Sequence, residues 1–583
     1  DRPHLPLRAA RAQPGSCMPS PNPRVARVGG RMAMVSPRGS SPSSMRLNVE
    51  DEATGVSWRS DPKLSKIPSW VLLVSVAVGA GVLGGLIGGC IGSAGGTASN
   101  TAGGGSTGMG PQSVLDLVNP SARLLADAPL RGTNFGGWLH LEDWFFSGSE
   151  GRWVATPDVK GQGVCFPPAV PSLSEPWPSE GFLVHRLNAT YGPEKTIEAF
   201  EAHRRSFIGI DDIRKVAKMG MKIVRVPLTW ALFPDALATL GNSGGPYVGF
   251  DPKTQSVIVP DPYYTTQVAY VTVPRNFVEE MLRAAADEGL QLLLDMHCLP
   301  GGSSKGTYNG VYPLDPVFWT AFAKIGNDST PLETVGLQIA EAMIRWVESM
   351  DDKTRSGVAG LTFMNEPGHM NAYATPQFAK DRQILEWLAA SADLFRRSSL
   401  PTMGVRLYVN VVETALHNFD SVVPQWWEQT FSVQERRTWA VIDRHWYAAW
   451  SGKFCSGRVA KGGAYFCDQP VEAIRKVWRE NTCARKWAEN FEKLFPDSLR
   501  ACSEMSGSTF HDGFLACNNE DVTRAFIAEQ AESMQDHGIE PFFWTWRMPY
   551  GPTFEGGWSL KRIAGLETPP ARPCRAAFSL FSV

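Results

Sequence analysis

Short β-rich runs alternate with helical patterns along residues 119–583, and this alternation constrains the fold more than any other feature of the sequence. The eight β-rich runs have nearly continuous apolar interiors, which is typical of strands buried on both faces of a parallel sheet. They span 131–135, 221–228, 290–297, 360–367, 406–413, 440–447, 500–506 and 541–548. Helical patterns lie between them, at 211–220, 276–289, 337–350 and 522–538.

Glycines mark the predicted helix ends. Gly220, Gly289 and Gly538 each lie between a helical pattern and the following strand, where a helix commonly stops. An α/β fold in which eight strands alternate with helices predicts a (β/α)8 TIM barrel. The alternative is a doubly wound open sheet, which predicts a Gly-rich phosphate turn after the first strand. The sequence there, NFGGW, is not G-x-G-x-x-G.

The residues before the barrel differ from it in composition. Residues 1–66 are rich in Pro, Ser and Arg and predict a disordered tail. Residues 70–91 carry no charge and as a helix would extend about 33 Å, enough to cross a bilayer. We therefore expect a transmembrane signal anchor over 67–91. A Gly/Ser-rich stalk follows at 92–118, and the barrel domain occupies 119–583.

Positive charges before the apolar span set its expected orientation. Arg59, Lys63 and Lys66 precede the span, whereas the first charge after it is Asp116. The positive-inside bias predicts a single-pass type II membrane protein with a cytoplasmic tail and an extracellular or lumenal barrel. A cleaved signal peptide, and hence a secreted protein, is the alternative. The apolar core of such a peptide is usually shorter, about 7–15 residues.

Composition narrows the possible partners. The chain has 56 Lys+Arg against 58 Asp+Glu, and this balance argues against nucleic acid, which requires a basic surface. Near-neutrality fits an uncharged polysaccharide. The 20 Trp residues are core filling or flat platforms for sugars, and both interpretations stay open. We expect a monomer that binds a carbohydrate.

The barrel hypothesis selects candidate functional residues, because chemistry in such barrels occurs at the carboxyl ends of the strands. Eight polar or aromatic residues lie at those ends: Arg225, His297, Asn365, Glu366, His445, Tyr447, Glu504 and Trp544.

Two glutamates carry the predicted chemistry. Glu366 follows an apolar run in FMNEPG, and Glu504 lies in CSEMS. Taken alone, Glu366 before a proline also fits the amino terminus of a helix. As a pair, two carboxylates on the strand ends of one barrel can face each other across a sugar ring. A separation of about 5–5.5 Å permits double displacement with retention of configuration, with one carboxyl protonated as the acid and the other ionised as the nucleophile.

Seven motifs in order resemble glycoside hydrolase family 5, and most closely its exo-1,3-β-glucanase (glucan β-glucosidase) branch. The resemblance covers about residues 131 to 550. The motifs are RGTNFGGWLHLEDW, HRRSFIGIDDIRKVAKMGMKIVRVPLTWALF, LLLDMHCLPGG, FMNEP, DRHWY, SEMS and FFWTWR.

The resemblance implies a retaining mechanism with Glu366 as acid/base and Glu504 as nucleophile. It implies that Arg225 orients Glu504 and keeps it ionised, and that Tyr447 donates a hydrogen bond to it. Asn365 would bind the 2-hydroxyl of the sugar. No metal or organic cofactor is expected for this chemistry.

The resemblance also implies how the sugar is held. His297 and His445 would contact sugar hydroxyls or the nucleophile, Trp544 would form the floor beneath the ring, and Glu142 would hold the terminal glucose. Structural roles compete with some of these: His297 also fits a buried core histidine, and an arginine before a proline also fits a surface ion pair. We expect packing roles for His203, Trp346 and one of Trp544 and Trp546.

Departures from the branch bear on the substrate. The stretch after His297 reads CLPGGSSKGT, so that Ser304 and Thr307 replace Asn and Asp, and Ala448 replaces a Gln after Tyr447. An exo-acting 1,3-β-glucanase remains the leading hypothesis. Endo action, a 1,6-β-glucan, a mixed-linkage oligosaccharide and a glycolipid are alternatives, as is an inactive glycan-binding surface protein. The substrate of the leading hypothesis is wall or storage β-glucan.

Cysteines and sequons fit a domain outside the cytoplasm. The barrel segment holds eight cysteines, an even number compatible with disulfides, and Cys455–Cys467 is the preferred pair. Cys298 and Cys502 adjoin active-site strands and equally fit buried thiols. The absence of a C-x-x-C pair makes a structural zinc site unexpected. Asn188 and Asn327 begin glycosylation sequons.

Overall fold

The computed structural model describes most of the predicted barrel domain. The described residues are 130–142, 178–238, 240, 242–369, 379–412, 415–449, 457–458, 465–481, 483–508, 520–548 and 557–567. The predicted tail, membrane anchor and stalk lie outside these residues and stay predictions. None of the helices within the described part is long and apolar enough to cross a membrane.

Eight parallel strands close into a barrel, as the sequence predicts, and the open-sheet alternative is wrong. Around the barrel they are β1 (Gly132–Asn134), β14 (Ile539–Phe543), β13 (Leu499–Met505), β10 (Ala440–Asp443), β9 (Arg406–Asn410), β8 (Val358–Thr362), β5 (Gln291–Cys298) and β2 (Ile223–Thr229). The first strand closes the ring, because Gly132 pairs with Phe542 of β14 on one side and with Ile223 of β2 on the other. Every predicted β-rich run contributes one strand.

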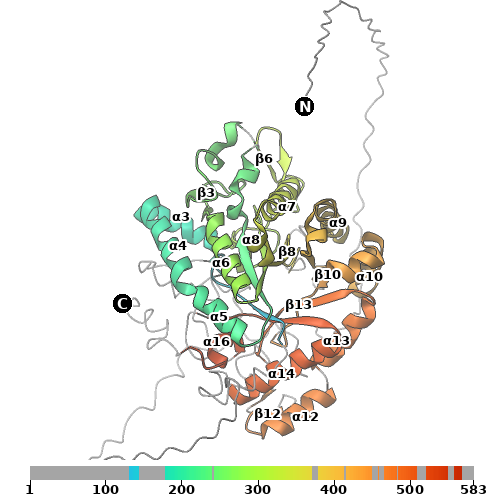
Figure 1. The fold of residues 1–583 in the computed structure, drawn as a ribbon. Helices are drawn as coiled ribbons and strands as arrows, with labels where there is room; N and C mark the ends of the chain where they lie inside the picture. Colours follow the sequence, from blue (N-terminus) through green and yellow to red (C-terminus); the bar gives the residue numbers. More distant parts are fainter. Residues whose placement is uncertain are drawn as a thin grey trace, which may run out of the picture. The chain divides into compact units, whose positions relative to one another are not determined.

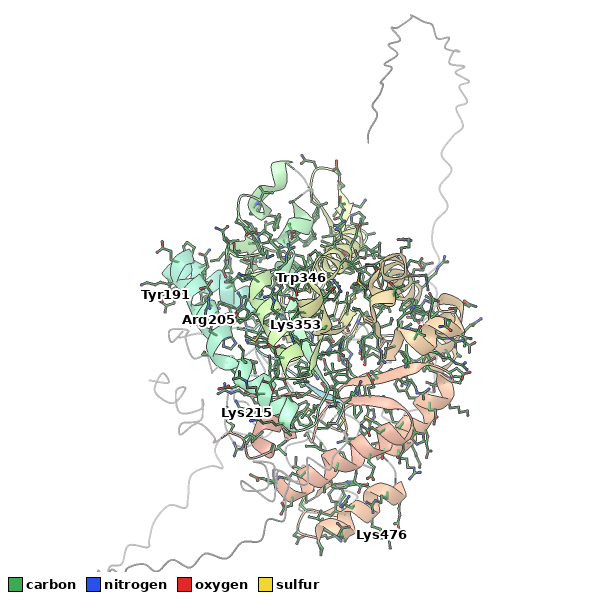
Figure 2. The ribbon with its side chains drawn as sticks, viewed as in Figure 1. Tyr191, Arg205, Lys215, Trp346, Lys353 and Lys476 are labelled. Atoms are coloured by element: carbon green, nitrogen blue, oxygen red, sulfur yellow. The ribbon has the colours of Figure 1, made fainter. Side chains whose placement is uncertain are left out.

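Helices form the outer layer (Figure 1). They are α3 (Glu180–Tyr191), α4 (Pro193–Phe207), α5 (Ile210–Lys218), α6 (Arg275–Asp287), α7 (Leu332–Glu348), α8 (Asp352–Ser356), α9 (Asp381–Arg397), α10 (Phe419–Thr430), α11 (Val433–Thr438), α12 (Val471–Asn481), α13 (Cys483–Leu494), α14 (Glu520–Asp536) and α16 (Leu560–Ile563). The four predicted helices correspond to α5, α6, α7 and α14. Charged side chains of α4, α8 and α12 project from this layer, among them Arg205, Lys353 and Lys476 (Figure 2).

Short antiparallel and parallel pairs lie in the loops. The antiparallel pairs are β3 (Ile258–Pro260) with β4 (Ala269–Val271) and β6 (Lys324–Ile325) with β7 (Thr330–Pro331), and the parallel pair is β11 (Gly457–Arg458) with β12 (Tyr465–Phe466).

The three predicted helix-end glycines adopt the expected backbone. Gly220, Gly289 and Gly538 have φ values of 85°, 70° and 63°, a left-handed conformation that glycine adopts without a steric cost. Each therefore ends a helix just before a barrel strand, and the chain can turn directly into the sheet.

Several strands end earlier than the sequence suggests. The predicted run 360–367 corresponds to a strand that stops at Thr362, and the run 440–447 stops at Asp443. The residues beyond these points form loops at the carboxyl end of the barrel. This difference matters for function, because Glu366 lies in such a loop with its own backbone geometry.

The expected packing residues are buried, and each has a polar atom in a hydrogen bond. Trp346 and Trp546 donate from Nε1 to Glu279 and Asp212, at 3.0 Å and 2.9 Å. Nε2 of His203 lies 2.9 Å from the Gly137 carbonyl, and burial lowers the pKa of His203 to about 3. A neutral, buried imidazole of this kind is structural, as predicted.

Gly132 occupies a position with no room for a side chain. A Cβ there would lie 2.1 Å from the Ile223 carbonyl oxygen and 2.8 Å from the Phe542 ring. We predict that Gly132→Ala lowers the free energy of unfolding by about 3 kcal/mol, because the closing strands must separate. Chemical denaturation measures this. Gly209→Ser is the control, since nothing lies within 4 Å of a Cβ there, and equal losses in the two variants would contradict the account.

Candidate active site

Eight of the nine predicted site residues lie at the carboxyl end of the barrel, and Arg225, the third of the seven residues of β2, contacts them from within its strand. Arg225, His297 and Glu504 belong to β2, β5 and β13, whereas the others follow β1, β8, β10 and β14 in the adjoining loops. The contacts described below join them into one continuous cluster. The cluster contains Glu142, Arg225, His297, Asn365, Glu366, His445, Tyr447, Glu504 and Trp544.

Glu504 is buried between two hydrogen-bond donors. Arg225 Nη1 lies 2.5 Å from Glu504 Oε1, and the Tyr447 hydroxyl donates to Oε2, also at 2.5 Å. Burial, followed by the Glu504 charge, raises the pKa of Tyr447 well above its ordinary value, so that it stays a neutral donor. Both carboxylate oxygens of Glu504 are thereby fixed in place.

Arg225 is itself held from several strands. Its guanidinium is fully buried and donates to Asn365 Oδ1 at 2.7 Å and to Asn134 Oδ1 at 3.1 Å. Asp295 lies 3.0 Å from Nη2. Burial disfavours the charge on Arg225, but Asp295 and Glu504 outweigh burial and raise the pKa. A permanent positive charge therefore lies against Glu504.

Glu366 faces Glu504 across the barrel end. Its Oε1 lies 2.7 Å from His445 Nδ1, and its backbone N–H donates to Asn410 Oδ1 at 2.9 Å. The residue has a φ of 42°, an uncommon conformation for a side chain larger than glycine. An oxygen of Glu366 lies within 4.8 Å of an oxygen of Glu504. This bound is shorter than the roughly 6.5–9.5 Å that separates the two carboxyl groups of inverting enzymes.

The paired carboxyls have pKa values shifted in opposite directions. Burial raises the pKa of Glu504, and the Glu366 charge adds to the rise while His445 and Arg225 oppose it. Burial also raises the pKa of Glu366, but His369 and His445 outweigh burial, and the net shift is downward. Glu366 is therefore the more acidic carboxyl in this arrangement. An acid at Glu366 and a nucleophile at Glu504 require the opposite order.

A second group of side chains flanks the carboxylate pair. His297 stacks on Trp544 with ring centroids 5.6 Å apart, and its Nε2 lies 3.5 Å from Glu142 Oε1 and 3.4 Å from Asn365 Nδ2. Asp295 Oδ2 lies 2.7 Å from His297 Nδ1. Trp544 is buried, and its ring packs against His297.

Sequence reasoning missed several members of the site. Asp295 and Asp443 are fully buried and lie two residues before His297 and His445. The repeated Asp-x-His pattern at two strand ends is a signal that could have found them, because residues two apart share a face of a strand.

Tyr308 was also missed. Its ring lies against His297 at 6.0 Å and against His369 at 6.2 Å. Burial and the nearby Glu366 raise the pKa of its hydroxyl. The phenol therefore stays protonated beside the carboxylate pair.

The structure describes two of the three side chains at which the sequence departs from the glucanase branch. The Ser304 hydroxyl donates to the backbone carbonyl of Glu366, and Ser304 is buried. The side chain of Thr307 lies outside the described residues, and Ala448 is fully buried. Ser304 thus ties two loops together.

The cysteines near the barrel end are thiols. Cys298 and Cys502 are buried and free, which resolves the alternative left open for them. Cys467 is disulfide-bonded. Its predicted partner, Cys455, lies outside the described residues, so this pairing stays a prediction.

Within the described residues, Glu366, His445 and Glu504 form the one group whose ligand atoms are close enough to hold a metal ion. Both oxygens of Glu504 already accept hydrogen bonds from Arg225 and Tyr447. A buried guanidinium beside these atoms disfavours a further cation. The donor set therefore fits hydrogen bonding better than metal coordination.

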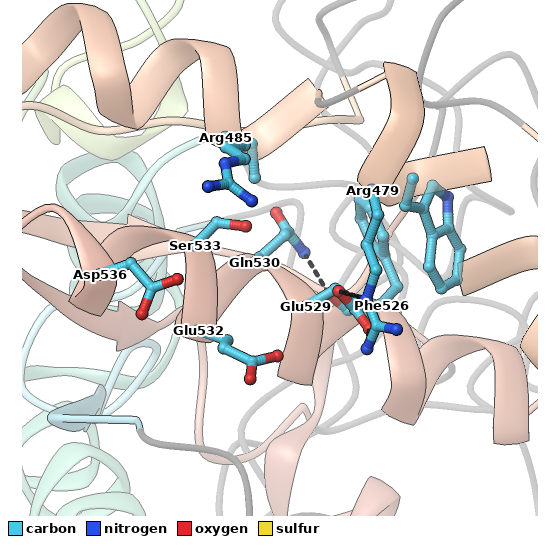
Figure 3. Close-up of a pocket in the computed structure, with 10 residues that line it drawn as sticks. Arg479, Arg485, Phe526, Glu529, Gln530, Glu532, Ser533 and Asp536 are labelled. Carbon is cyan, nitrogen blue, oxygen red and sulfur yellow. Dashed lines mark hydrogen bonds and ion pairs between the residues drawn. The ribbon is translucent and has the colours of Figure 1, made fainter. Parts of the chain in front are cut away.

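A separate pocket of about 220 Å³ lies among α12, α13 and α14. Trp478, Arg479, Arg485, Phe526 and Glu529 are among its lining residues. Glu529 accepts from Arg479 Nη2 at 2.8 Å inside it (Figure 3). No predicted site residue lines this pocket.

A closed parallel barrel with paired glutamates at its carboxyl end is the arrangement typical of glycosidases. No protein-family model matches the chain. A probable glucan 1,3-beta-glucosidase A of Neosartorya fischeri is 25% identical over 290 residues, 50% of this chain and 52% of that protein. A glucan 1,3-beta-glucosidase of Lachancea kluyveri is 21% identical over 331 residues, 55% of this chain and 56% of that protein.

A probable glucan 1,3-beta-glucosidase A of Aspergillus fumigatus matches a shorter segment, 25% identical over 33% of this chain and 32% of that protein. The chain thus spans between a third and just over half of these relatives' lengths. The sequence matches confirm a resemblance to glucan 1,3-β-glucosidases, at low identity and over part of their length.

Solved structures resemble the chain only at low identity and low TM-scores. A rutinosidase from Aspergillus niger has 17% identity and a TM-score of 0.44, covering 76% of this chain and 98% of its own. A glycoside hydrolase family 5 enzyme from Prevotella bryantii has 12% identity and a TM-score of 0.37, covering 81% of this chain and 100% of its own. At these scores the likeness adds nothing to the sequence matches.

The carboxylates around two histidines predict that both imidazoles are charged at neutral pH. Burial lowers the pKa of each, but Asp295 and Glu142 raise that of His297 to about 9, and Glu504, Asp443 and Glu366 raise that of His445 to about 10. We predict that both rings are protonated at pH 7. Two-dimensional spectra of protein labelled with ¹⁵N-histidine report this directly.

The raised pKa values of His297 and His445 also make the stability of the fold depend on pH. Both pKa values lie above the unfolded value of about 6.5, so the stabilisation is complete below that pH and is lost as the pH rises through about 9 and 10. Neutral imidazoles at pH 7 would contradict the arrangement of charges described here.

Proposed function

We propose that this protein is a retaining β-glycosidase that cleaves β-glucosidic bonds in β-glucan. The observation that carries the proposal is the spacing of Glu366 and Glu504, whose oxygens lie within 4.8 Å. Two carboxyls this close favour attack on the sugar by one of them over attack by a separate water, which needs a wider gap. A glycan-binding protein needs no such buried and mutually repelling pair.

In the first step Glu504 attacks the anomeric carbon, and Glu366 protonates the departing oxygen. Arg225 and Tyr447 hold the two oxygens of Glu504, so one lone pair can point at the sugar without rearrangement. In the second step Glu366 takes a proton from water, which releases the sugar from Glu504 with its configuration retained. Asn365 is proposed to bind the 2-hydroxyl, since Arg225 fixes its side-chain oxygen at 2.7 Å.

The acid role requires the pKa of Glu366 to rise when a sugar binds. A sugar that excludes water from the carboxyl supplies this rise through desolvation, and an ionised Glu504 within 4.8 Å adds to it. His445 is the neighbouring proton reservoir, because its Nδ1 lies 2.7 Å from Glu366. We therefore expect a bell-shaped pH dependence of kcat/KM that reports the coupled titration of Glu366 and His445 rather than that of one residue.

Within this class, the first candidate activity is that of an exo-acting 1,3-β-glucanase, whose substrate is 1,3-β-glucan. The matched relatives are named glucan 1,3-beta-glucosidase, and Glu142, which we propose binds the terminal sugar, lies 3.5 Å from His297. A different linkage is the second candidate, favoured by Ser304. Its hydroxyl is engaged with the Glu366 carbonyl, so it does not replace the sugar contact of the usual asparagine.

Removal of the nucleophile provides the first test. We predict that Glu504→Gln lowers kcat/KM on laminarin-type glucan at least about 10⁴-fold, because no covalent intermediate can form. Release of glucose is the measurement. Glu529→Gln is the matched control: Glu529 is also a buried, ion-paired glutamate, but it lies on α14 away from the site. Equal activity of Glu504→Gln and wild type would contradict the proposal.

Removal of the acid/base provides the second test. For Glu366→Ala we predict slow turnover that azide partly restores, because the small anion can attack the sugar bound to Glu504. The expected product is a β-glucosyl azide, identified by NMR. An α-configured azide is incompatible with double displacement.

The products decide among the linkages. We predict that glucose is the first product from β-1,3-glucan, measured beside β-1,4- and β-1,6-glucans under identical conditions. Oligosaccharides as first products indicate endo action. Faster release from β-1,6-glucan than from β-1,3-glucan indicates that the second candidate is correct.

We further propose that the barrel lies outside the cytoplasm, anchored through residues 67–91. The uncharged span, the preceding basic residues and the disulfide at Cys467 support this location, because disulfides persist in oxidising compartments. Membranes washed at alkaline pH should retain the full chain. Its release into the soluble fraction would favour a cleaved signal peptide instead.

A further inference from the structure

Asp443 is a buried carboxylate behind the proposed acid/base, and the predicted site residue it lies against is His445, whose Nε2 is 3.7 Å from its Oδ2. It is fully buried at the end of β10. Its Oδ1 accepts from the Ser503 N–H at 2.9 Å, and its Oδ2 accepts from the Ser503 hydroxyl at 2.6 Å and from Asn410 Nδ2 at 2.8 Å. An ionised carboxylate accepts only, so each partner must act as the donor.

The first connection from Asp443 reaches the backbone of Glu366. Because Asn410 gives its NH₂ group to Asp443, its carbonyl oxygen must face the other way. That oxygen accepts the N–H of Glu366 at 2.9 Å, at the residue with a φ of 42°. A side chain in this conformation needs its surroundings to hold it. Asp443 thus fixes the loop that carries the acid/base.

The second connection reaches the carboxylate of Glu366. The Ser503 hydroxyl donates its one proton to Asp443 and is left to accept at its lone pairs. His445 Nε2 lies 3.0 Å from that hydroxyl oxygen, and His445 Nδ1 lies 2.7 Å from Glu366 Oε1. With both ring nitrogens facing acceptors, the imidazole carries two protons. The charge on Asp443 therefore sets the direction of every hydrogen bond up to Glu366.

Other charged groups also face His445. Glu504 Oε2 lies 3.4 Å from its Nδ1, and Asp443 Oδ2 lies 3.7 Å from its Nε2. His369, beyond Glu366, repels it. Asp443 is the only one of the carboxylates around this ring that takes no part in the proposed bond making, and its charge can be removed without touching either glutamate.

We propose that Asp443 is a positioning residue for the acid/base, acting on the Glu366 backbone through Asn410 and on its carboxylate through Ser503 and His445. The inference rests on the proposed glycosidase function and adds a residue to it. It implies that loss of Asp443 affects proton transfer to the leaving group more than attack by Glu504, although the Ser503 N–H that Asp443 accepts belongs to the residue before Glu504. The second buried aspartate, Asp295, contacts Arg225 and His297, on the side of Glu504.

The two aspartates therefore form a matched pair for an experiment. The variants are Asp443→Asn and Asp295→Asn, and kcat/KM is measured with phenyl β-glucoside and with 2,4-dinitrophenyl β-glucoside. The phenyl leaving group requires a proton, whereas the dinitrophenyl group departs without one. For Asp443→Asn we expect a loss of about 100-fold on the phenyl glucoside and of no more than about threefold on the dinitrophenyl glucoside. For Asp295→Asn we expect similar losses on both.

The pH profile supplies a readout that a merely structural role would not move. Removing the negative charge beside His445 destabilises its protonated form, so the basic limb of kcat/KM for the phenyl glucoside should shift to lower pH in Asp443→Asn. Asp443→Glu, which keeps the charge, should retain the wild-type limb. An unshifted limb in Asp443→Asn overturns the inference.

The outcomes separate the inference from the proposed function. Equal losses on both glucosides for Asp443→Asn, or no loss on either, overturn the positioning role. If that variant does not fold, Ser503→Ala and Asn410→Ala each remove one connection and leave Asp443 in place. Selective loss on the phenyl glucoside in either supports the role, and equal losses in both overturn it. A folded wild type that hydrolyses neither glucoside contradicts the proposed function itself.

Discussion

The contact between Arg225 and Glu504 is the interaction on which the rest of the site depends. A fully buried guanidinium is costly unless its charge is matched and its donors are satisfied. Here Glu504 lies 2.5 Å away and Asp295 lies 3.0 Å away, while Asn365 and Asn134 accept two further hydrogen bonds from Nη2 and Nη1. The strands that supply these partners must close into a barrel for the charges to meet. Closure of the barrel therefore also places the proposed nucleophile against its positive partner.

Glu366, the proposed acid/base, has a separate support. Asp443, Ser503 and Asn410 come from β10, β13 and β9, three adjacent strands, and they hold Glu366 through its backbone and through His445. Two buried aspartates thus serve two sides of one site. Each aspartate is the first residue of an Asp-x-His pattern. The same short sequence signal therefore marks both places where a buried negative charge lies beside a histidine.

The strands and the glutamate pair could be predicted from the sequence, because both depend on local patterns. Apolar runs followed by Glu or His, and glycines such as Gly220 and Gly289 that end helices, are visible without any knowledge of contacts. The supporting residues could not be predicted in the same way. Asn410 and Ser503 matter only because β8 lies beside β9 and β13 beside β10, and this neighbourhood is a property of the closed sheet. The loop conformation at Glu366 was hidden for a similar reason, since the strand stops at Thr362.

The central claim is that Glu504 forms a covalent bond to the sugar while Glu366 handles the proton. Incubation with 2,4-dinitrophenyl 2-deoxy-2-fluoro-β-glucoside tests it most directly, because the fluorine slows release of the sugar from the nucleophile. The account predicts a stable adduct of one fluoroglucosyl group per chain, located by peptide mass spectrometry on the peptide that carries Glu504. An adduct on Glu366, or turnover of glucan by a protein that never forms an adduct, would contradict it.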